Sequence, residues 1–133
     1  MGDGAAGVGN SLNNVTAFPA PVLYAATWNT SKLYLFGQAL AQEHKSKARN
    51  IVLSPTINIL RSPLWSRAGE TFTEDPFLAS RPAAAETLGI QSQKMLACPK
   101  HFAAYNQDKN RFGLNPGWEA YDSLVDRRVL HEV

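Results

Sequence analysis

The chain has 133 residues, enough for one domain with a core of its own. Hydrophobic residues make up 44% of it and charged residues 18%, which excludes an intrinsically disordered chain. The formal net charge of +2 is small and the basic residues are scattered, so we expect no nucleic-acid partner. We also expect no membrane partner, because no apolar run approaches membrane-spanning length. Residues 1–4 lack the basic start and apolar core of a signal peptide, and the compartment is left open.

Apolar or small residues recur at helical spacing over residues 31–49. This spacing puts them on one face of a helix. A polar side chain at residues 29–31 can cap its start, and basic residues suit its C-terminal end. The positions on this face are Leu33, Phe36, Gly37, Leu40 and Ala41.

A short apolar run at residues 51–53, closed by a Ser-Pro pair, predicts a buried strand. A loop rich in proline, tryptophan and charged residues follows over residues 56–75. We expect the next helix to begin near Ser80, because Pro82 then falls in its first turn, where a missing N–H is tolerated.

A second apolar run at residues 95–98 predicts another strand, followed by a polar loop over residues 100–118. A last helix is predicted after Asp126. The alternation of strand and helix predicts an α/β fold with a parallel sheet. In such folds the loops at the carboxyl ends of the strands carry the chemistry, so residues 56–75 and 100–118 are the candidate site.

The loop after the second strand begins with Lys100 and His101 and ends in Arg111. Three hydrogen-bond-donating side chains at the exit of a buried strand suit a ligand covered with oxygen atoms. This pattern favours a sugar-processing protein.

A zinc site was also considered, because Cys98 and His101 have the spacing of half such a site. His44 and His131 stand apart on predicted helices, whereas structural zinc takes four ligands. We therefore expect no metal and no other cofactor.

Motifs of recognisable form occur in four blocks of the sequence. The first reads Asp-Gly-Ala-Ala-Gly-Val at residues 3–8, followed by Thr-Ala-Phe-Pro-Ala-Pro at residues 16–21. The second reads Asn-Ile-Leu-Arg-Ser-Pro-Leu-Trp-Ser-Arg-Ala-Gly-Glu-Thr-Phe-Thr-Glu-Asp-Pro at residues 58–76. Lys-His-Phe stands at residues 100–102, and Val-Asp-Arg-Arg-Val-Leu-His-Glu at residues 125–132.

In this order the blocks resemble glycoside hydrolase family 3, the β-glucosidase and β-xylosidase group, over nearly all of the chain. The resemblance implies that residues 1–133 are an incomplete N-terminal portion of the family's barrel domain. We therefore expect the first part of a (β/α)8 TIM-like barrel. The implied activity is that of a retaining, exo-acting β-glucosidase-like enzyme that hydrolyses terminal β-linked sugars, with a small β-glucoside or β-xyloside as substrate. The rest of the barrel and a second domain are the expected partners.

Five residues receive sugar-binding roles from the resemblance. A carboxylate can accept hydrogen bonds from sugar hydroxyls, while Lys, Arg and His donate to them. The family's nucleophile and acid/base lie beyond the motifs matched here, so no catalytic residue is assigned and we expect these residues alone to hydrolyse nothing. The five residues are Asp3, Arg61, Lys100, His101 and Arg111.

Departures from the family pattern refine this interpretation. Residues 103–105 read Ala-Ala-Tyr where the hexosaminidase branch carries Pro-Gly-His, which favours a glucosidase-like or xylosidase-like member. Ser66 stands where a glycine is usual, so the loop near Trp65 is expected to follow a different path.

Two other interpretations remain open: a non-catalytic or degenerate sugar-binding relative, and an unrelated α/β domain whose loops are structural. Arg67 and Glu70 are expected to form a structural ion pair. Trp65, Phe72 and Phe102 are expected to pack within the protein rather than stack on a sugar.

Overall fold

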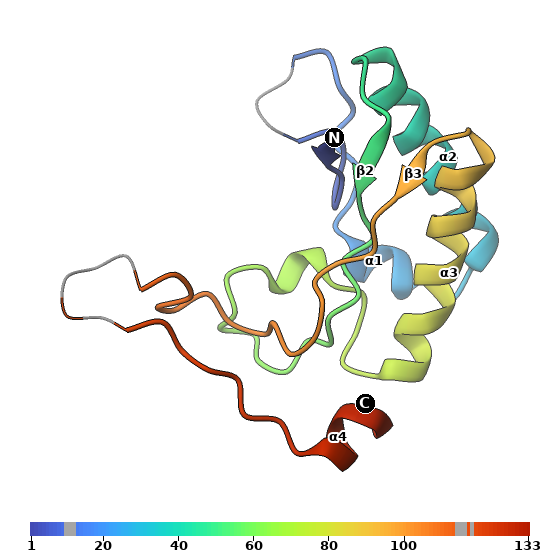
Figure 1. Ribbon diagram of the computed structural model, residues 1–133. Helices are drawn as coiled ribbons and strands as arrows, with labels where there is room; N and C mark the ends of the chain where they lie inside the picture. The colour runs from blue at the N-terminus through green and yellow to red at the C-terminus, as the bar shows by residue number, and fades with distance from the viewer. Residues whose placement is uncertain (10–12, 114–116, 118) are drawn as a thin grey trace.

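The computed structural model describes residues 1–9, 13–113, 117 and 119–133. These residues form a three-stranded parallel sheet in the order β1-β2-β3 (Figure 1). In its register, Asp3 of β1 lies opposite Leu53 of β2, and Val52 of β2 lies opposite Ala97 of β3. The strands are β1 (Gly2–Asp3), β2 (Ile51–Leu53) and β3 (Leu96–Ala97).

Two long helices, α2 and α3, link successive strands and lie together on one side of the sheet (Figure 1). The predicted βαβ alternation is therefore confirmed. The short helix α4 lies apart from the sheet, at the end of an extended segment (Figure 1). The helical segments are α1 (Pro21–Ala25), α2 (Thr30–Ser46), the 3-10 turn η1 (Ala68–Glu70), α3 (Pro76–Ser92) and α4 (Arg127–Glu132).

Helix α2 buries the predicted apolar face against the sheet and α3. Its start is fixed by Asn29, one of the three residues at which a cap was expected, whose Oδ1 accepts a hydrogen bond from Lys32 N at 3.1 Å. No helix in the described part of the chain is long and apolar enough to cross a membrane. The main core cluster comprises Phe36, Leu40, Ala41, Val52, Ile90 and Met95.

The start of α3 differs from the prediction. The helix begins at Pro76 rather than near Ser80, and Pro82 lies inside it. Asp75 caps the helix, with its Oδ1 accepting from Leu78 N at 2.6 Å. The Asp-Pro pair supplies both a capping side chain and a proline at the first helical position, which outweighs the cost of the later proline.

Glycines allow α2 and α3 to cross at backbone contact. A Cβ placed on Gly37 would lie 2.3 Å from the carbonyl oxygen of Glu86, and one on Gly89 would lie 2.2 Å from that of Tyr34. Each helix therefore presents a glycine where the backbone of the other passes. No larger residue fits without separating the two helices.

Behind the sheet, the carboxyl group of Glu86 is buried on α3, with the residue 1% exposed. Its Oε1 accepts a hydrogen bond of 2.6 Å from Ser54 Oγ, at the exit of β2. Burial raises the pKa of this carboxyl to about 7, although the bond from Ser54 opposes the shift. The acid therefore holds a proton through the mildly acidic range.

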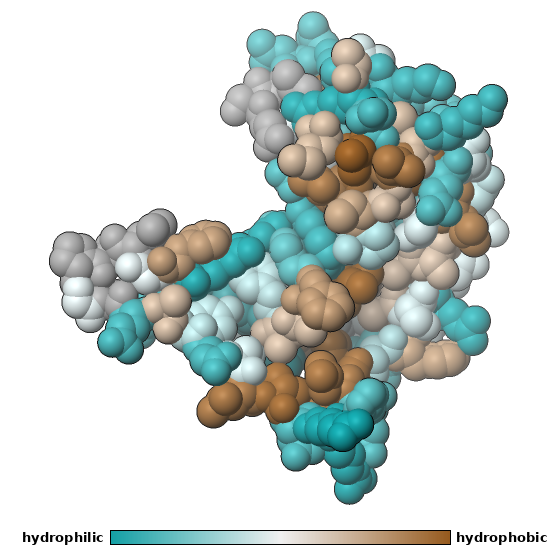
Figure 2. Space-filling view, in the orientation of Figure 1, coloured by the Kyte–Doolittle hydropathy of each residue, from teal (hydrophilic) through white to brown (hydrophobic). Residues whose placement is uncertain are grey.

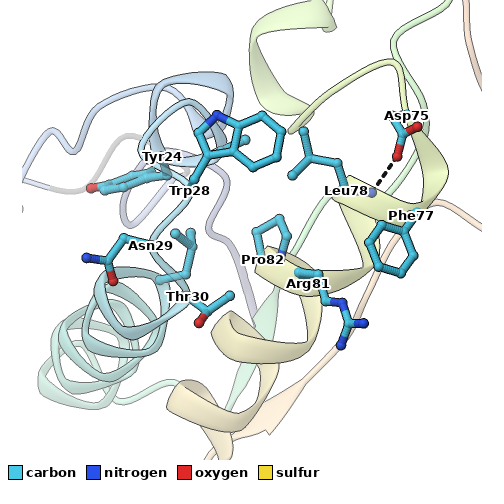
Figure 3. A pocket seen from close by; sticks show the side chains of 11 residues that line it. Tyr24, Trp28, Asn29, Thr30, Asp75, Phe77, Leu78, Arg81 and Pro82 are labelled. Atoms are coloured by element: carbon cyan, nitrogen blue, oxygen red, sulfur yellow. Dashed lines mark hydrogen bonds between the residues drawn. The ribbon is translucent and has the colours of Figure 1, made fainter.

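An apolar hollow of about 460 Å³ opens on the outer layer, where α1 and the first turns of α2 and α3 meet. Figure 3 shows Trp28, from the connection between α1 and α2, beside Leu78 of α3, with Pro82 below them. Its lining residues are Tyr24, Ala25, Trp28, Asn29, Thr30, Leu33, Asp75, Phe77, Leu78, Arg81 and Pro82.

Replacing Gly37 with alanine should lower the free energy of unfolding by about 1–3 kcal/mol, because the new methyl group meets backbone that cannot move aside. This loss should exceed the gain of about 1 kcal/mol that alanine brings to a helix. Urea unfolding of the purified variants measures the change. Gly69→Ala is the matched control, since a Cβ at that position meets nothing within 4 Å. Equal stability of the two variants would rule out the close crossing.

Glu86 should make stability depend on pH. Between its ordinary pKa of 4.5 and its folded value of about 7, the folded state keeps a proton that the unfolded state loses, so stability falls as pH rises through this window. Glu86→Gln keeps an acceptor for Ser54 and removes the proton linkage. Its stability relative to wild type should therefore improve by about 2–3 kcal/mol between about pH 4 and about pH 8. Urea unfolding at both pH values measures this. The exposed Glu74→Gln serves as control and should show the same pH dependence as wild type. If the stability of Glu86→Gln changes with pH in the same way as that of wild type, the linkage is disproved.

Candidate functional site

Asp3 and Lys100 lie at the same end of the sheet, where the parallel strands have their carboxyl ends. Asp3 ends β1, and Lys100 follows β3. The backbone of Lys100 is fixed at both ends, because its N–H donates to Pro55 O at 2.9 Å and its carbonyl accepts from Ile57 N at 2.7 Å. This placement aims the Lys100 side chain across β2 toward β1.

Lys100 and Asp3 form an ion pair across the sheet. Lys100 Nζ donates to Asp3 Oδ1 at 2.7 Å, joining residues 97 positions apart. The lysine side chain is 12% exposed and the aspartate side chain 49% exposed. The hydrogen bond from Lys100 holds the pKa of Asp3 below its usual range against an opposing effect of burial. At neutral pH Asp3 is therefore a carboxylate, and its side chain is still half exposed.

A buried histidine holds the backbone at the end of β1. His44 of α2 is fully buried, and its Nε2 lies 3.2 Å from the carbonyl oxygens of both Gly2 and Asp3. Its Nδ1 lies 3.0 Å from Leu40 O. The sequence placed this residue on a helix but gave no sign that it contacts the site.

His101 is clasped by Asn58, from the loop after β2. Asn58 Oδ1 accepts from the backbone N of His101 at 2.7 Å and lies 3.1 Å from its Nδ1. Asn58 Nδ2 donates to the carbonyl of His101 at 3.1 Å. Burial lowers the pKa of His101 to about 4, helped by the positive charges of Arg67 and Lys100. The imidazole is therefore neutral at physiological pH.

Arg67 and Glu70 form the structural ion pair expected from the sequence. Arg67 Nε and Nη2 each donate to a Glu70 carboxylate oxygen at 2.7 Å, in a two-pronged arrangement. The pair raises the pKa of Arg67, chiefly through the hydrogen bond to Glu70. Trp65 and Phe72 are packed as expected, at 4% and 2% exposed. Phe102 is fully exposed instead, because it follows the end of β3, where the described residues give it nothing to pack against.

Five of these residues, Asp3, Lys100, His101, Arg67 and Glu70, line a polar hollow of about 900 Å³ over the carboxyl ends of β1 and β3. It shares no lining residue with the apolar hollow of Figure 3. We call it the polar hollow. Its lining residues are Asp3, Gly4, Ala5, Ala6, Gly7, Val8, Gly9, Val15, Thr16, Ala17, Leu53, Arg67, Glu70, Lys100 and His101.

Arg111 lies next to this hollow, separated from it by one aromatic ring. Its Nη1 donates to Tyr105 Oη at 2.9 Å, and its guanidinium carbon lies 4.0 Å from the centre of the Tyr105 ring. That ring packs edge-on against His101, with centroids 4.6 Å apart. Tyr105 is thus the link between two predicted sugar-binding residues, although in the sequence it stands out only as a departure from a motif.

Arg61 lies elsewhere. It is exposed and lines a second hollow of about 700 Å³, together with Trp65, Ser66 and Asp108. The side chain of Asp108 accepts hydrogen bonds from Ser66 and Tyr105, so the two long loops are tied together between the hollows. Of the five predicted residues, three line the polar hollow. Arg111 adjoins it and Arg61 does not, because the loop after β2 turns away at Ser62, whose carbonyl accepts from Trp65 N at 3.2 Å.

A comparison with protein families decides the identity. The sequence model of the family described as the glycosyl hydrolase family 3 N-terminal domain matches residues 2–119. The chain belongs to glycosyl hydrolase family 3. It is 43% identical over 118 residues to β-glucosidase A of Butyrivibrio fibrisolvens and 40% identical over 128 residues to thermostable β-glucosidase B of Acetivibrio thermocellus. These alignments cover 89% and 96% of this chain but only 13% and 16% of the relatives.

Solved structures of family 3 β-glucosidases share the fold. A β-glucosidase from Paenibacillus barengoltzii superposes with a TM-score of 0.81 at 31% identity, over 98% of this chain and 14% of that one. DesR, a β-glucosidase from Streptomyces venezuelae in complex with D-glucose, superposes with a TM-score of 0.79 at 36% identity, over 84% of this chain and 15% of DesR. The sheet and helices described above are therefore the first part of this family's (β/α)8 barrel, as the resemblance implied.

Proposed function

We propose that the chain supplies the sugar-binding part of a retaining, exo-acting β-glycosidase that hydrolyses terminal β-linked sugars. The observation that carries this proposal is the Lys100–Asp3 ion pair beside neutral His101, in a polar hollow at the carboxyl ends of parallel strands. The glucose complex of the related DesR supports a sugar as ligand. Asp3, Lys100 and His101 hold the terminal sugar directly. Arg111, held by Tyr105, and Arg61, from the neighbouring loop, complete the set.

The chemistry of these groups suits a pyranose. Each sugar hydroxyl both donates and accepts, so a carboxylate beside an ammonium group can bind two neighbouring hydroxyls at once. Hydrogen bonds to charged groups are worth about 1.5–3 kcal/mol each. Contacts that tighten as the ring flattens toward an oxocarbenium ion accelerate hydrolysis as well as binding substrate.

The proposal includes further barrel strands and a second domain that bring the catalytic carboxyl groups. Retaining glycosidases use two such groups, and a complete barrel of this type takes about 250 residues. The exposure of Leu96 on β3 and of Phe102 beyond it supports further protein packed over these strands, and Figure 2 shows apolar side chains uncovered over the strands. Residues 1–133 are then the N-terminal portion of the barrel domain.

The test is hydrolysis of aryl β-D-glucosides and β-D-xylosides by the protein as its gene encodes it. We expect hydrolysis of at least one. Lys100→Met should lower kcat/KM by about 10- to 100-fold, because it removes a charged hydrogen bond and leaves Asp3 without its partner. Lys45→Met, on the exposed end of α2, is the matched control and should hydrolyse at the wild-type rate.

Two results would count against this proposal. Glucose binding without any hydrolysis would favour the non-catalytic relative considered from the sequence. Neither binding nor hydrolysis would remove the sugar interpretation altogether.

A further inference from the structure

The amide of Asn58 makes three contacts to one residue, His101, and these determine more than its position. Asn58 is 8% exposed, so water does not compete freely for its polar atoms. Its amide meets the backbone N–H of His101, the backbone carbonyl of His101 and the ring atom Nδ1. The first two contacts fix which way the amide faces.

The oxygen of Asn58 must be the atom that faces the His101 N–H. A flipped amide would set its NH2 group against that N–H at 2.7 Å and its oxygen against the His101 carbonyl at 3.1 Å. Both contacts would then be repulsive, and two buried polar groups would be left without hydrogen-bond partners. The backbone of His101 therefore orients the amide without reference to the ring.

The ring must in turn match the oxygen it faces. Nδ1 lies 3.1 Å from Asn58 Oδ1, which has only lone pairs to offer, so Nδ1 must carry a proton. A neutral imidazole has one N–H and one lone pair. We propose that Asn58 is a positioning residue that fixes His101 as the Nδ1–H tautomer, so that Nε2 accepts a hydrogen bond from one hydroxyl of the sugar.

The surroundings keep the second nitrogen unprotonated. Arg67, Lys100 and Arg111 place positive charge around His101, while the carboxylates of Glu70 and Asp3 oppose them. The pKa of His101 is about 4, so Nε2 has its lone pair free at neutral pH. The edge of the Tyr105 ring packs against the imidazole and holds its plane.

In this tautomer His101 accepts a hydrogen bond from the sugar, whereas the sequence-based expectation was that it donates one. Lys100 donates, while Asp3 and His101 both accept. The hollow then selects sugars whose hydroxyls donate at two points, and it rejects analogues in which either of these hydroxyls is replaced by fluorine. The identity of the ligand as a sugar rests on the proposed function. The tautomer of His101 does not, because it follows from the contacts with Asn58 alone.

The tautomer is measured by nitrogen NMR on the wild-type protein near neutral pH. We expect the His101 ring to show a protonated Nδ1 and an unprotonated Nε2, while exposed His131 serves as an internal reference in the same spectrum. Asn58→Ala should release His101 into a mixture of tautomers. Asn50→Ala, which removes an exposed amide, should leave it unchanged. A protonated Nε2 in the wild-type protein would overturn the proposal whether or not any sugar binds.

Competitive inhibition by D-glucose and its monodeoxy and monofluoro analogues then identifies the hydroxyl. At the position that donates to His101, fluorine should weaken inhibition about tenfold, no less than removal of the oxygen does, because fluorine cannot donate. This penalty should shrink in Asn58→Ala, because part of the His101 population then carries its proton on Nε2 and no longer accepts, and it should persist unchanged in Asn50→Ala. Failure of glucose to inhibit would count against the proposed function, whereas inhibition with penalties that Asn58→Ala leaves unchanged would refute the acceptor role alone.

Discussion

The ion pair between Lys100 and Asp3 is the interaction on which the rest of the site depends. It links Lys100, three residues beyond the end of β3, to Asp3, the last residue of β1, so it bridges the carboxyl end of the central strand β2. A mostly buried ammonium group needs a partner, so removal of Asp3 would leave the charge of Lys100 poorly compensated. Behind the pair, His44 ties the carbonyl of Asp3 to α2, and the exit of β2 holds both backbone groups of Lys100. The polar hollow is thus built from the core outward.

The fold was largely predictable because its signals are local. The apolar face of α2, a polar cap within residues 29–31 and the strand at residues 51–53 were all confirmed, since each depends on neighbours within a few positions. The predicted start of α3 was wrong. The prediction assumed that Pro82 must lie in the first turn, whereas the Asp-Pro pair at residues 75–76 begins the helix. The close crossing at Gly37 had no such signal, because the atom that excludes a side chain there belongs to another helix.

The site was predictable only in part, because its contacts join residues that lie far apart in the sequence. Motif order located Asp3, Lys100 and His101, which converge because parallel strands end at one edge. It did not indicate that Arg61 lines a neighbouring hollow instead, because the path of that loop depends on a turn at Ser62 that the motif does not determine. It also missed the residues that act through others. Asn58 and His44 reach partners 43 and 41 positions away, and no spacing in the sequence encodes such contacts.

The most direct test of this account is an NMR titration of the Asp3 carboxyl. If Lys100 holds it by a hydrogen bond across the sheet, Asp3 in the wild-type protein titrates below the ordinary range of aspartate. In Lys100→Met its pKa rises, while Lys45→Met leaves it in place. An ordinary Asp3 pKa in the wild-type protein, or one that Lys100→Met fails to move, would contradict the central claim that this pair organises the site.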